Sequence, residues 1–234
     1  MVSTSFSPSE DLDIVSRSRG IDSFHSHPPG AEPSIDKVDF KRSLPGFRAK
    51  QGRFDLIEVP DSQYLMINGH GDPNTSPDFA SALTSLYPLA YGLKFFSKLE
   101  LGRDYVVPPL EGLWWADDMT TFTSARDKSA WDFTLMLFVP DWLDGEHVDG
   151  VVETVRSKGS APRLGEIRFE TLREGTCVQT LHIGPFDDEG PVLERMHTEV
   201  IPEAGMKMSG DHHEIYLSDF RRTAPEKLRT ILRQ

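Results

Sequence analysis

The sequence has little cysteine and no long apolar run. Its 234 residues include one cysteine, Cys177, which excludes a disulfide framework within the chain and any zinc site built from several cysteines. No apolar segment approaches the roughly 18 consecutive residues that a membrane-spanning helix requires. The N-terminus also lacks the basic and then apolar layout of a secretory signal. We therefore expect a reduced, cytoplasmic protein without a membrane partner.

Basic side chains are in the minority. Lys and Arg total 25 against 37 Asp and Glu, which gives a formal net charge of −12. Because phosphate recognition needs a basic surface, this composition disfavours a nucleic-acid partner. The eight histidines follow no metal-ligand spacing: His212 and His213 are adjacent and would point to opposite faces of a strand, and no H-E-x-x-H motif occurs. We expect neither a metal ion nor another cofactor.

The first 36 residues lack periodic apolar positions. They hold nine Ser, four Pro and six acidic residues but only two Arg. A segment of this composition buries too little apolar surface to offset the entropy of ordering its backbone. We predict a disordered, acidic, Ser/Pro-rich tail over residues 1–36; the alternative is that Ile14, Val15 and Ile21 dock on the rest of the chain. Residues 37–234 are long enough to form one domain with a sizeable core.

Apolar periodicity predicts strands and helices from about residue 54 onward. One helix is expected to begin at Pro77 after a Ser76 N-cap, and a second at Pro191. The spacing of Thr223 and Glu226 matches a capping box and predicts a C-terminal helix. Strands are expected over residues 56–59, 64–67, 110–115, 131–139, 167–172, 177–183 and 212–217, with a short helix over residues 149–155.

Two stretches of the sequence repeat weakly. Residues 64–69 (YLMING) precede a helix that reaches residues 91–94 (YGLK), and residues 179–184 (QTLHIG) precede one that reaches residues 204–207 (AGMK). Each unit then continues into a strand that ends in acidic residues. A duplicated strand-strand-helix-strand unit is the simplest explanation, with chance similarity as the alternative. Two units related by a pseudo-dyad would leave a ligand groove where they meet.

Residues 111–118 (EGLWWADD) form the most unusual stretch. On a strand, Trp114 and Trp115 face opposite sides, so one can pack in the core while the other lines a groove. An indole near a carboxylate such as Glu111 suits planar, aromatic or cationic ligands, through stacking and cation–π attraction. The alternative is a pair of core tryptophans followed by a solvated acidic turn.

Residues 212–217 (HHEIYL) form the second candidate. Glu214 lies between apolar strand residues and shares a face with His212 and Tyr216. Desolvation disfavours the charged form of a half-buried carboxylate, which suits a general base or a partner for a cationic ligand. The alternative is a surface strand with exposed polar side chains.

Together these motifs resemble the GyrI-like small-molecule-binding family, in its branch with a double-Trp motif. The resemblance covers roughly residues 37–234 and implies an α+β fold. In that fold, duplicated strand-strand-helix-strand units form an antiparallel sheet with helices packed on it and a central ligand groove. Glu214 matches the family's recurrent ligand-facing acid, whereas Phe186 stands where Tyr is usual. The matching segments are residues 72–74, 105–115, 182–190, 212–219 and 222–228.

The double-Trp branch is associated with hydrolysis of cyclopropane-bearing compounds that alkylate DNA, which confers resistance to genotoxins. The resemblance implies that Glu214 activates water, that Tyr105 or Tyr216 donates to the developing oxyanion, and that one of the two tryptophans stacks the planar substrate. The alternative is a non-catalytic protein that sequesters or senses bulky aromatic or cationic compounds. We expect a monomer or weak homodimer. The candidate ligand-contacting residues, from the strand patterns and the resemblance together, are Trp114, Trp115, Glu111, Tyr216, Phe186 and His212.

Overall fold

The computed structural model describes residues 36–118, 121 and 127–234. The tail predicted over residues 1–36 therefore lies, apart from Asp36, outside the described residues, and its disorder stays a prediction. Among the described residues, no helix combines the length and the apolar composition needed to cross a membrane.

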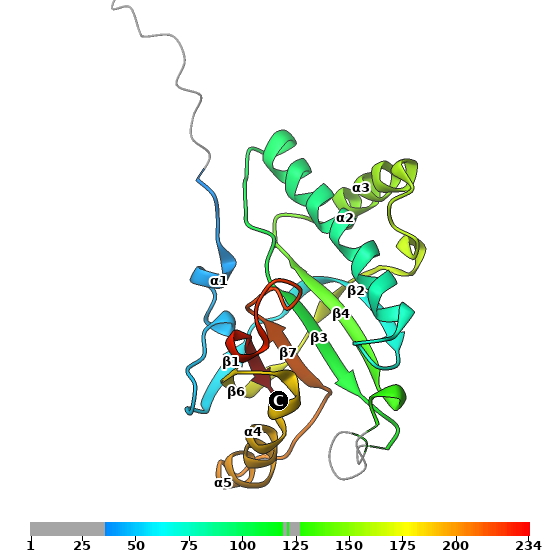
Figure 1. The fold of residues 1–234 in the computed structure, drawn as a ribbon. Coiled ribbons are helices and arrows are strands. Elements are labelled where there is room, and N and C mark those ends of the chain that lie inside the picture. Colours follow the sequence, from blue (N-terminus) through cyan, green and yellow to red (C-terminus); the bar gives the residue numbers. More distant parts are fainter. Residues whose placement is uncertain (1–35, 119–120, 122–126) are drawn as a thin grey trace, which may run out of the picture. The chain divides into compact units, whose positions relative to one another are not determined.

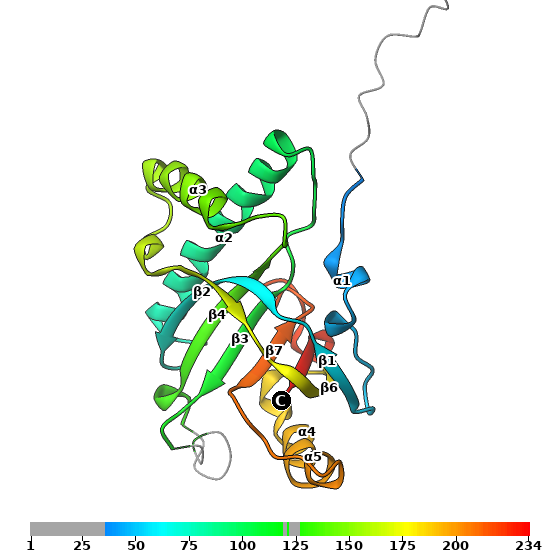
Figure 2. The same cartoon turned by 180° about the vertical axis from the view of Figure 1, so that it is seen from behind.

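Eight strands form one antiparallel sheet in the order β1-β6-β8-β7-β3-β4-β2-β5 (Figures 1 and 2). The strands are β1 (Asp55–Val59), β2 (Ser62–His70), β3 (Leu110–Trp115), β4 (Asp132–Val139), β5 (Arg168–Leu172), β6 (Gly175–Ile183), β7 (His212–Tyr216) and β8 (Arg229–Arg233). The helices are α1 (Phe40–Ser43), α2 (Pro77–Glu100), α3 (Gly145–Lys158), α4 (Gly190–Arg195) and α5 (Ile201–Glu203), with a π-helical turn at Met196–Val200 between the last two.

The sheet order confirms the duplication predicted from the sequence. The first half runs β1-β2-α2-β3-β4 and the second runs β5-β6, then the helices α4 and α5, then β7-β8. The first strand of each half pairs with the second strand of the other half, as β1 with β6 and β5 with β2. Strands β3 and β7 meet at the centre. Each half therefore has one strand more than the predicted unit.

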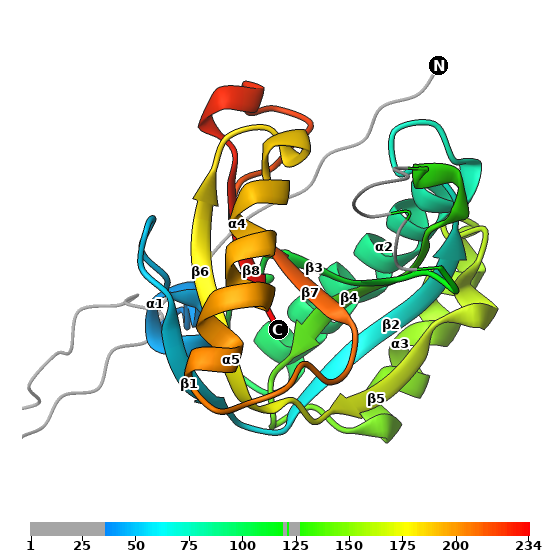
Figure 3. The same ribbon diagram turned by 90° about the horizontal axis from the view of Figure 1, so that it is seen from below.

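Both helical groups cover the same face of the sheet. Directly paired residues of antiparallel strands point to one face, and by this register Leu65, Leu135 and Trp114 share a face with Val178 and Leu232. Helix α2 packs its apolar residues on the first group, and Met196 and Ile201 pack on the second. Figure 3 shows the two helical groups on either side of the β3–β7 pair. The central strands thus lie between the two helical groups.

The C-terminal helix predicted from the capping-box spacing is wrong. Pro225–Lys227 form a single 3-10 turn without a side-chain cap, and the chain then enters β8. This strand pairs with β6 on one side and β7 on the other. Residues 230–233 are buried, so the strand gains ladder hydrogen bonds on both edges and packing on both faces. Those interactions outweigh the local preference for a helix.

Candidate functional site

The site is built on the central strand pair. In the register of β3 and β7, Leu110 lies opposite Tyr216, Gly112 opposite Glu214, and Trp114 opposite His212. These side chains therefore point to the face that carries the helices. The alternation predicted for Glu214, His212 and Tyr216 is what places the three together. Trp114 joins them from the neighbouring strand.

Glu214 is a carboxylate with little access to solvent: its side chain is 14% exposed. Its Oε1 lies 3.5 Å from His212 Nε2, and its carboxylate is hydrogen-bonded to the Tyr216 side chain. Tyr216 also accepts a hydrogen bond of 2.9 Å from Trp114 Nε1. Burial first, and then Glu214, raise the pKa of Tyr216 well above its ordinary value. The hydroxyl is therefore protonated at neutral pH and holds the Glu214 carboxylate in place.

Gly112 makes this chain of contacts possible. A Cβ atom at this position would lie 2.9 Å from Trp114 Nε1 and 3.2 Å from the Tyr216 hydroxyl. The indole can thus approach Tyr216 across the strand because Gly112 has no side chain. The close approach that this glycine permits is therefore made by Trp114.

Aromatic rings surround the polar centre. Trp114 stacks on Phe79 of α2, with ring centroids 6.2 Å apart and an interplanar angle of 24°, and it also packs against Phe133. From the second half, Phe186 contacts Tyr216 edge-on, with ring centroids 5.7 Å apart. The ring centroids of Phe220 and Tyr216 are 6.1 Å apart. Apolar walls around a few polar groups are typical of small-molecule sites.

Two histidines lie side by side at this site. The π-helical turn Met196–Val200 brings His197 to His212, with ring centroids 6.5 Å apart. Burial first, and then His212, lower the pKa of His197 to about 4, so its ring is neutral at pH 7. The ring nitrogens of His212 are buried without a hydrogen-bond partner among the described residues. Of the two nitrogens, Nε2 faces Glu214 Oε1 at 3.5 Å.

Not all sequence-predicted residues reach this site. Glu111 and Trp115 lie on the opposite face of the sheet. Glu111 is fully buried, where its Oε2 is 3.0 Å from His213 Nε2 and accepts a 3.4 Å hydrogen bond from Tyr64. The expected contact between Glu111 and a groove ligand is therefore not supported, because adjacent odd and even positions of β3 face opposite sides.

Tyr105 is also remote from Glu214. It lies before β3, where it is buried against Phe40 and Trp142. Burial raises the pKa of its hydroxyl. The structure therefore brings together Trp114, His212, Glu214, Tyr216 and Phe186, and it leaves Glu111, Trp115 and Tyr105 outside. Of the residues that the sequence did not indicate, Phe79, Phe133, His197 and Phe220 have no motif that would distinguish them from ordinary core or loop positions.

An ion pair also joins the two halves near this site. Lys128 Nζ, in the 3-10 turn before β4, lies 2.7 Å from Asp187 Oδ1 in the 3-10 turn before α4. Glu189, next to that second turn, is almost fully buried and acts electrostatically on Tyr216. The surroundings of Tyr216 and Glu214 are therefore acidic as well as aromatic. Among the described residues, no group of three or more His, Cys, Asp or Glu side chains is arranged to hold a metal ion.

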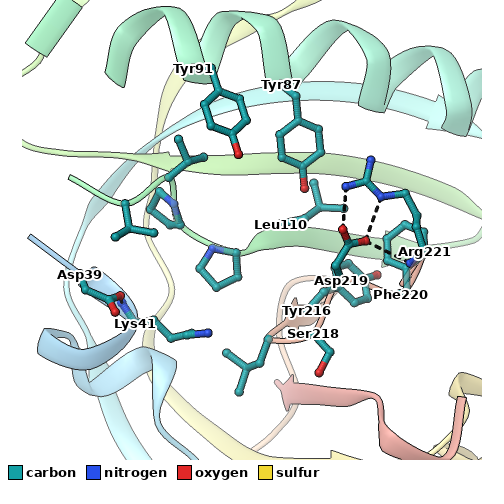
Figure 4. Close-up of a pocket in the computed structure, with 15 residues that line it drawn as sticks. Asp39, Lys41, Tyr87, Tyr91, Leu110, Tyr216, Ser218, Asp219, Phe220 and Arg221 are labelled. Atoms are coloured by element: carbon teal, nitrogen blue, oxygen red, sulfur yellow. Dashed lines mark hydrogen bonds and ion pairs between the residues drawn. The ribbon is translucent and has the colours of Figure 1, made fainter. Parts of the chain in front are cut away.

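A cavity of about 280 Å³ adjoins this centre (Figure 4). Tyr216 and Leu110 line it from the central strands, Tyr87 and Tyr91 line it from α2, and Arg221 lines it from the loop after β7. Because Tyr216 is also bonded to Glu214, this one ring belongs to both the cavity and the polar centre.

Residues 52–233 match the model of the GyrI-like small-molecule-binding domain. The chain belongs to this family. Three solved structures from Listeria innocua are similar to this GyrI-like chain. An uncharacterized conserved protein is 36% identical, with a TM-score of 0.75, and the match covers 84% of this chain and 98% of that one. Two proteins described as hydrolases are each 35% identical, with TM-scores of 0.72 and 0.74; the matches cover 84% and 85% of this chain and 98% of each of theirs. No curated protein matches the chain.

Proposed function

We propose that this GyrI-like protein hydrolyses cyclopropane-bearing aromatic compounds that alkylate DNA, and so protects a cell from them. The observation that carries the proposal is the Glu214 carboxylate, poorly exposed to solvent and held by Tyr216 beside an aromatic wall. Two similar proteins from Listeria innocua are described as hydrolases, which supports a reaction with water.

The proposed reaction adds one water molecule to the substrate. Glu214 takes a proton from water as the water oxygen attacks the cyclopropane methylene carbon. The strained carbon–carbon bond breaks, and its electron pair moves through the conjugated dienone to the carbonyl oxygen, which becomes a phenolate. The phenolate then gains a proton, and Glu214 returns its own to solvent. Atoms and charges balance, and no cofactor enters the reaction.

The surrounding side chains have distinct roles in this reaction. Trp114 is 4% exposed and packs on Phe79 and Phe133, so it supports Tyr216 from the core and does not stack the substrate, as one of the two tryptophans was expected to do. The partly exposed rings of Phe186 and Phe220 beside Tyr216 offer the aromatic surface for the substrate.

Tyr216 orients the Glu214 carboxylate and is not the oxyanion donor, since its hydroxyl is committed to Glu214. His212, with Nε2 3.5 Å from Glu214 Oε1, helps to hold the carboxylate, and solvent protonates the phenolate. Ring strain lowers the barrier, so one positioned base is sufficient.

The test is turnover by a Glu214→Gln variant. Glutamine preserves size and hydrogen bonding but does not take a proton, so we expect hydrolysis to fall by roughly 10²–10⁴. Mass spectrometry of a cyclopropane-fused indolone incubated with each protein would measure the water adduct. Glu170→Gln, on the exposed edge strand β5, is the matched control and should react like wild type. A Glu214→Gln rate within a few-fold of wild type would exclude the base.

A second candidate is sequestration without catalysis. Both Glu214 and Glu189 raise the pKa of Tyr216 through their negative charges, so two carboxylates act on the surroundings of Tyr216. Such surroundings favour aromatic cations. Titration with a fluorescent aromatic cation would then show binding that weakens in Glu189→Gln, with no water adduct formed by any variant. Turnover by the wild-type protein would reject this candidate.

A further inference from the structure

A second cavity, of about 300 Å³, lies beside α4. Three segments line it: α4 itself, the C-terminal part of β6, and the residues just before β1. In the sheet, β8 separates β6 from β7, so at about 4.8 Å per strand the β6 wall lies roughly 10 Å from the strand that carries Glu214. We refer to this space as the outer cavity, because none of the described residues that line it belongs to the Glu214 centre or to the cavity of Figure 4.

One part of the outer cavity is apolar. Phe54, Pro191 and Val192 contribute to its lining, and two of them, Phe54 and Val192, also pack on the buried cluster around Met196. That cluster supports the apolar wall from behind. A volume of about 300 Å³ is at the lower end of the range for small-molecule pockets, roughly 300–1,000 Å³. The space therefore suits a small ligand with one ring.

The charge of the outer cavity has the opposite sign to that of the whole chain. Among the described residues that line it, Arg195 alone carries a full charge and no Asp or Glu is present, although the net charge of the chain is −12. The Arg195 guanidinium lies 5.1 Å from the centroid of the Phe54 ring, so positive charge and apolar wall adjoin. A planar guanidinium in this setting favours a carboxylate.

Arg195 has a partner, but a weak one. Its Nε lies 3.4 Å from Glu199 Oε2, and the two side chains are 56% and 61% exposed. Exposed ion pairs of this kind contribute little free energy. The guanidinium has five N–H donors, so a ligand carboxylate can bind beside Glu199 or displace it.

The β6 side of the outer cavity adds polar groups without negative charge. His182 is 7% exposed, and its Nε2 lies 3.0 Å from the Pro185 carbonyl oxygen. Because a carbonyl only accepts, Nε2 carries the proton and donates it. Thr180, two positions earlier on the strand, lines the same side. Nothing on this side repels an anion.

We propose that the outer cavity is a binding site for a small aromatic carboxylate. The carboxylate lies on the Arg195 guanidinium, and the ring lies against Phe54 and Val192. This site goes beyond the hydrolysis proposed at Glu214 and does not depend on it. A neutral amide of the same shape lacks the charge that Arg195 recognises.

The test is an NMR titration of the full ¹⁵N-labelled chain with benzoate, and with benzamide as the neutral probe. We expect benzoate to cause saturable shifts of the backbone amides of Gly52 and Leu181, which line the outer cavity, and much smaller shifts at Gly112 beside Glu214. Benzamide should bind at least about tenfold more weakly, the size of a lost hydrogen bond to a charged group. Equal affinities for the two probes, largest shifts at Gly112, or no saturable shift would each overturn the site.

Three variants at exposed positions localise the charge. Arg195→Gln should raise the Kd of benzoate about tenfold. Glu199→Gln should lower it by up to about fivefold, because it releases the guanidinium from an exposed ion pair. Arg156→Gln is the matched control: Arg156 on α3 is 57% exposed, pairs with Glu153 one turn earlier and does not line the outer cavity, so the Kd should not change. Equal effects of Arg195→Gln and Arg156→Gln would overturn the proposal.

Discussion

Gly112 determines whether the polar centre around Glu214 can form. It lies opposite Glu214 in the sheet and beneath the contact between Trp114 and Tyr216. Any side chain at this position would separate the indole from the phenol. The position of Glu214 would then change as well, because Tyr216 is its hydrogen-bond partner.

We therefore expect Gly112→Ala to destabilise the protein by roughly 1–3 kcal/mol, as overpacking of a buried position does. Gly150→Ala is the control, because a Cβ there meets no atom within 4 Å and the residue lies inside α3; it should be neutral or stabilising by up to about 1 kcal/mol. Urea unfolding followed by tryptophan fluorescence measures both. Changes of the same sign in the two variants would contradict this view of Gly112.

For single residues, the alternation of side chains between the two faces of a strand was the most reliable prediction from the sequence. It placed His212, Glu214 and Tyr216 on one face, as the structure does. The same alternation puts Glu111, three positions from Trp114, on the opposite face of the sheet, so its absence from the Glu214 centre could be predicted from the sequence. The contacts of Phe79 and His197 could not be predicted, because they depend on how separate elements pack.

Among the elements, β8 differs most from the expectation. Arg229 and Arg233 begin and end this strand, in the segment that the capping-box spacing of Thr223 and Glu226 predicts as a helix. The structure places Arg233 in the interior, 2% exposed, where its Nη1 is 2.8 Å from Glu174 Oε2 and Nη2 donates to the Gly46 carbonyl at 2.7 Å. A buried arginine is satisfied by partners far away in the sequence, so no local pattern reveals it.

Arginine-to-alanine changes at the two ends of β8 should differ sharply. Arg233→Ala leaves the Glu174 carboxylate without its arginine partner in the interior, which we expect to cost roughly 3–5 kcal/mol. Arg229→Ala removes an exposed side chain and should change stability by no more than about 0.5 kcal/mol. Chemical denaturation of both variants checks this. A small effect at Arg233 would mean that the ion pair does not support the fold.

For the whole domain, the two faces of the sheet have different roles. One face carries the helices and the polar centre around Glu214. The other buries a charged network that joins both halves: His213 of β7 lies 3.0 Å from Glu111 of β3 through Nε2, and 2.7 Å from Glu174 through Nδ1. Arg233 extends this network to Gln179 of β6. The duplication was visible in the sequence, but the network was not, since its members come from five separate segments.

This network makes stability depend on pH. Burial would raise the pKa of Glu174, but His213 and Arg233 outweigh burial and lower it from 4.5 to about 2. A carboxyl whose pKa is lower in the folded than in the unfolded state stabilises the fold above the unfolded pKa. That stabilisation is lost as the pH falls toward the folded pKa. It amounts to at most roughly 3–4 kcal/mol, at 1.36 kcal/mol per pKa unit.

Glu174→Gln removes this carboxylate at every pH, so it isolates the effect. We expect the free energy of unfolding of wild type to exceed that of Glu174→Gln most between about pH 5.5 and 6.5, and the gap to shrink steadily as the pH falls through about 4.5 toward 3. Burial alone would lower the pKa of His213, but its carboxylate partners, Glu174 among them, raise it, so the gap also narrows as the pH rises and His213 loses its proton. Urea unfolding at closely spaced pH values measures the gap. Glu170→Gln, at an exposed strand position, should show no such gap at any pH. A Glu174→Gln gap that stayed constant down to about pH 3 would show that Glu174 stabilises the domain by packing and hydrogen bonding, without a contribution from its charge.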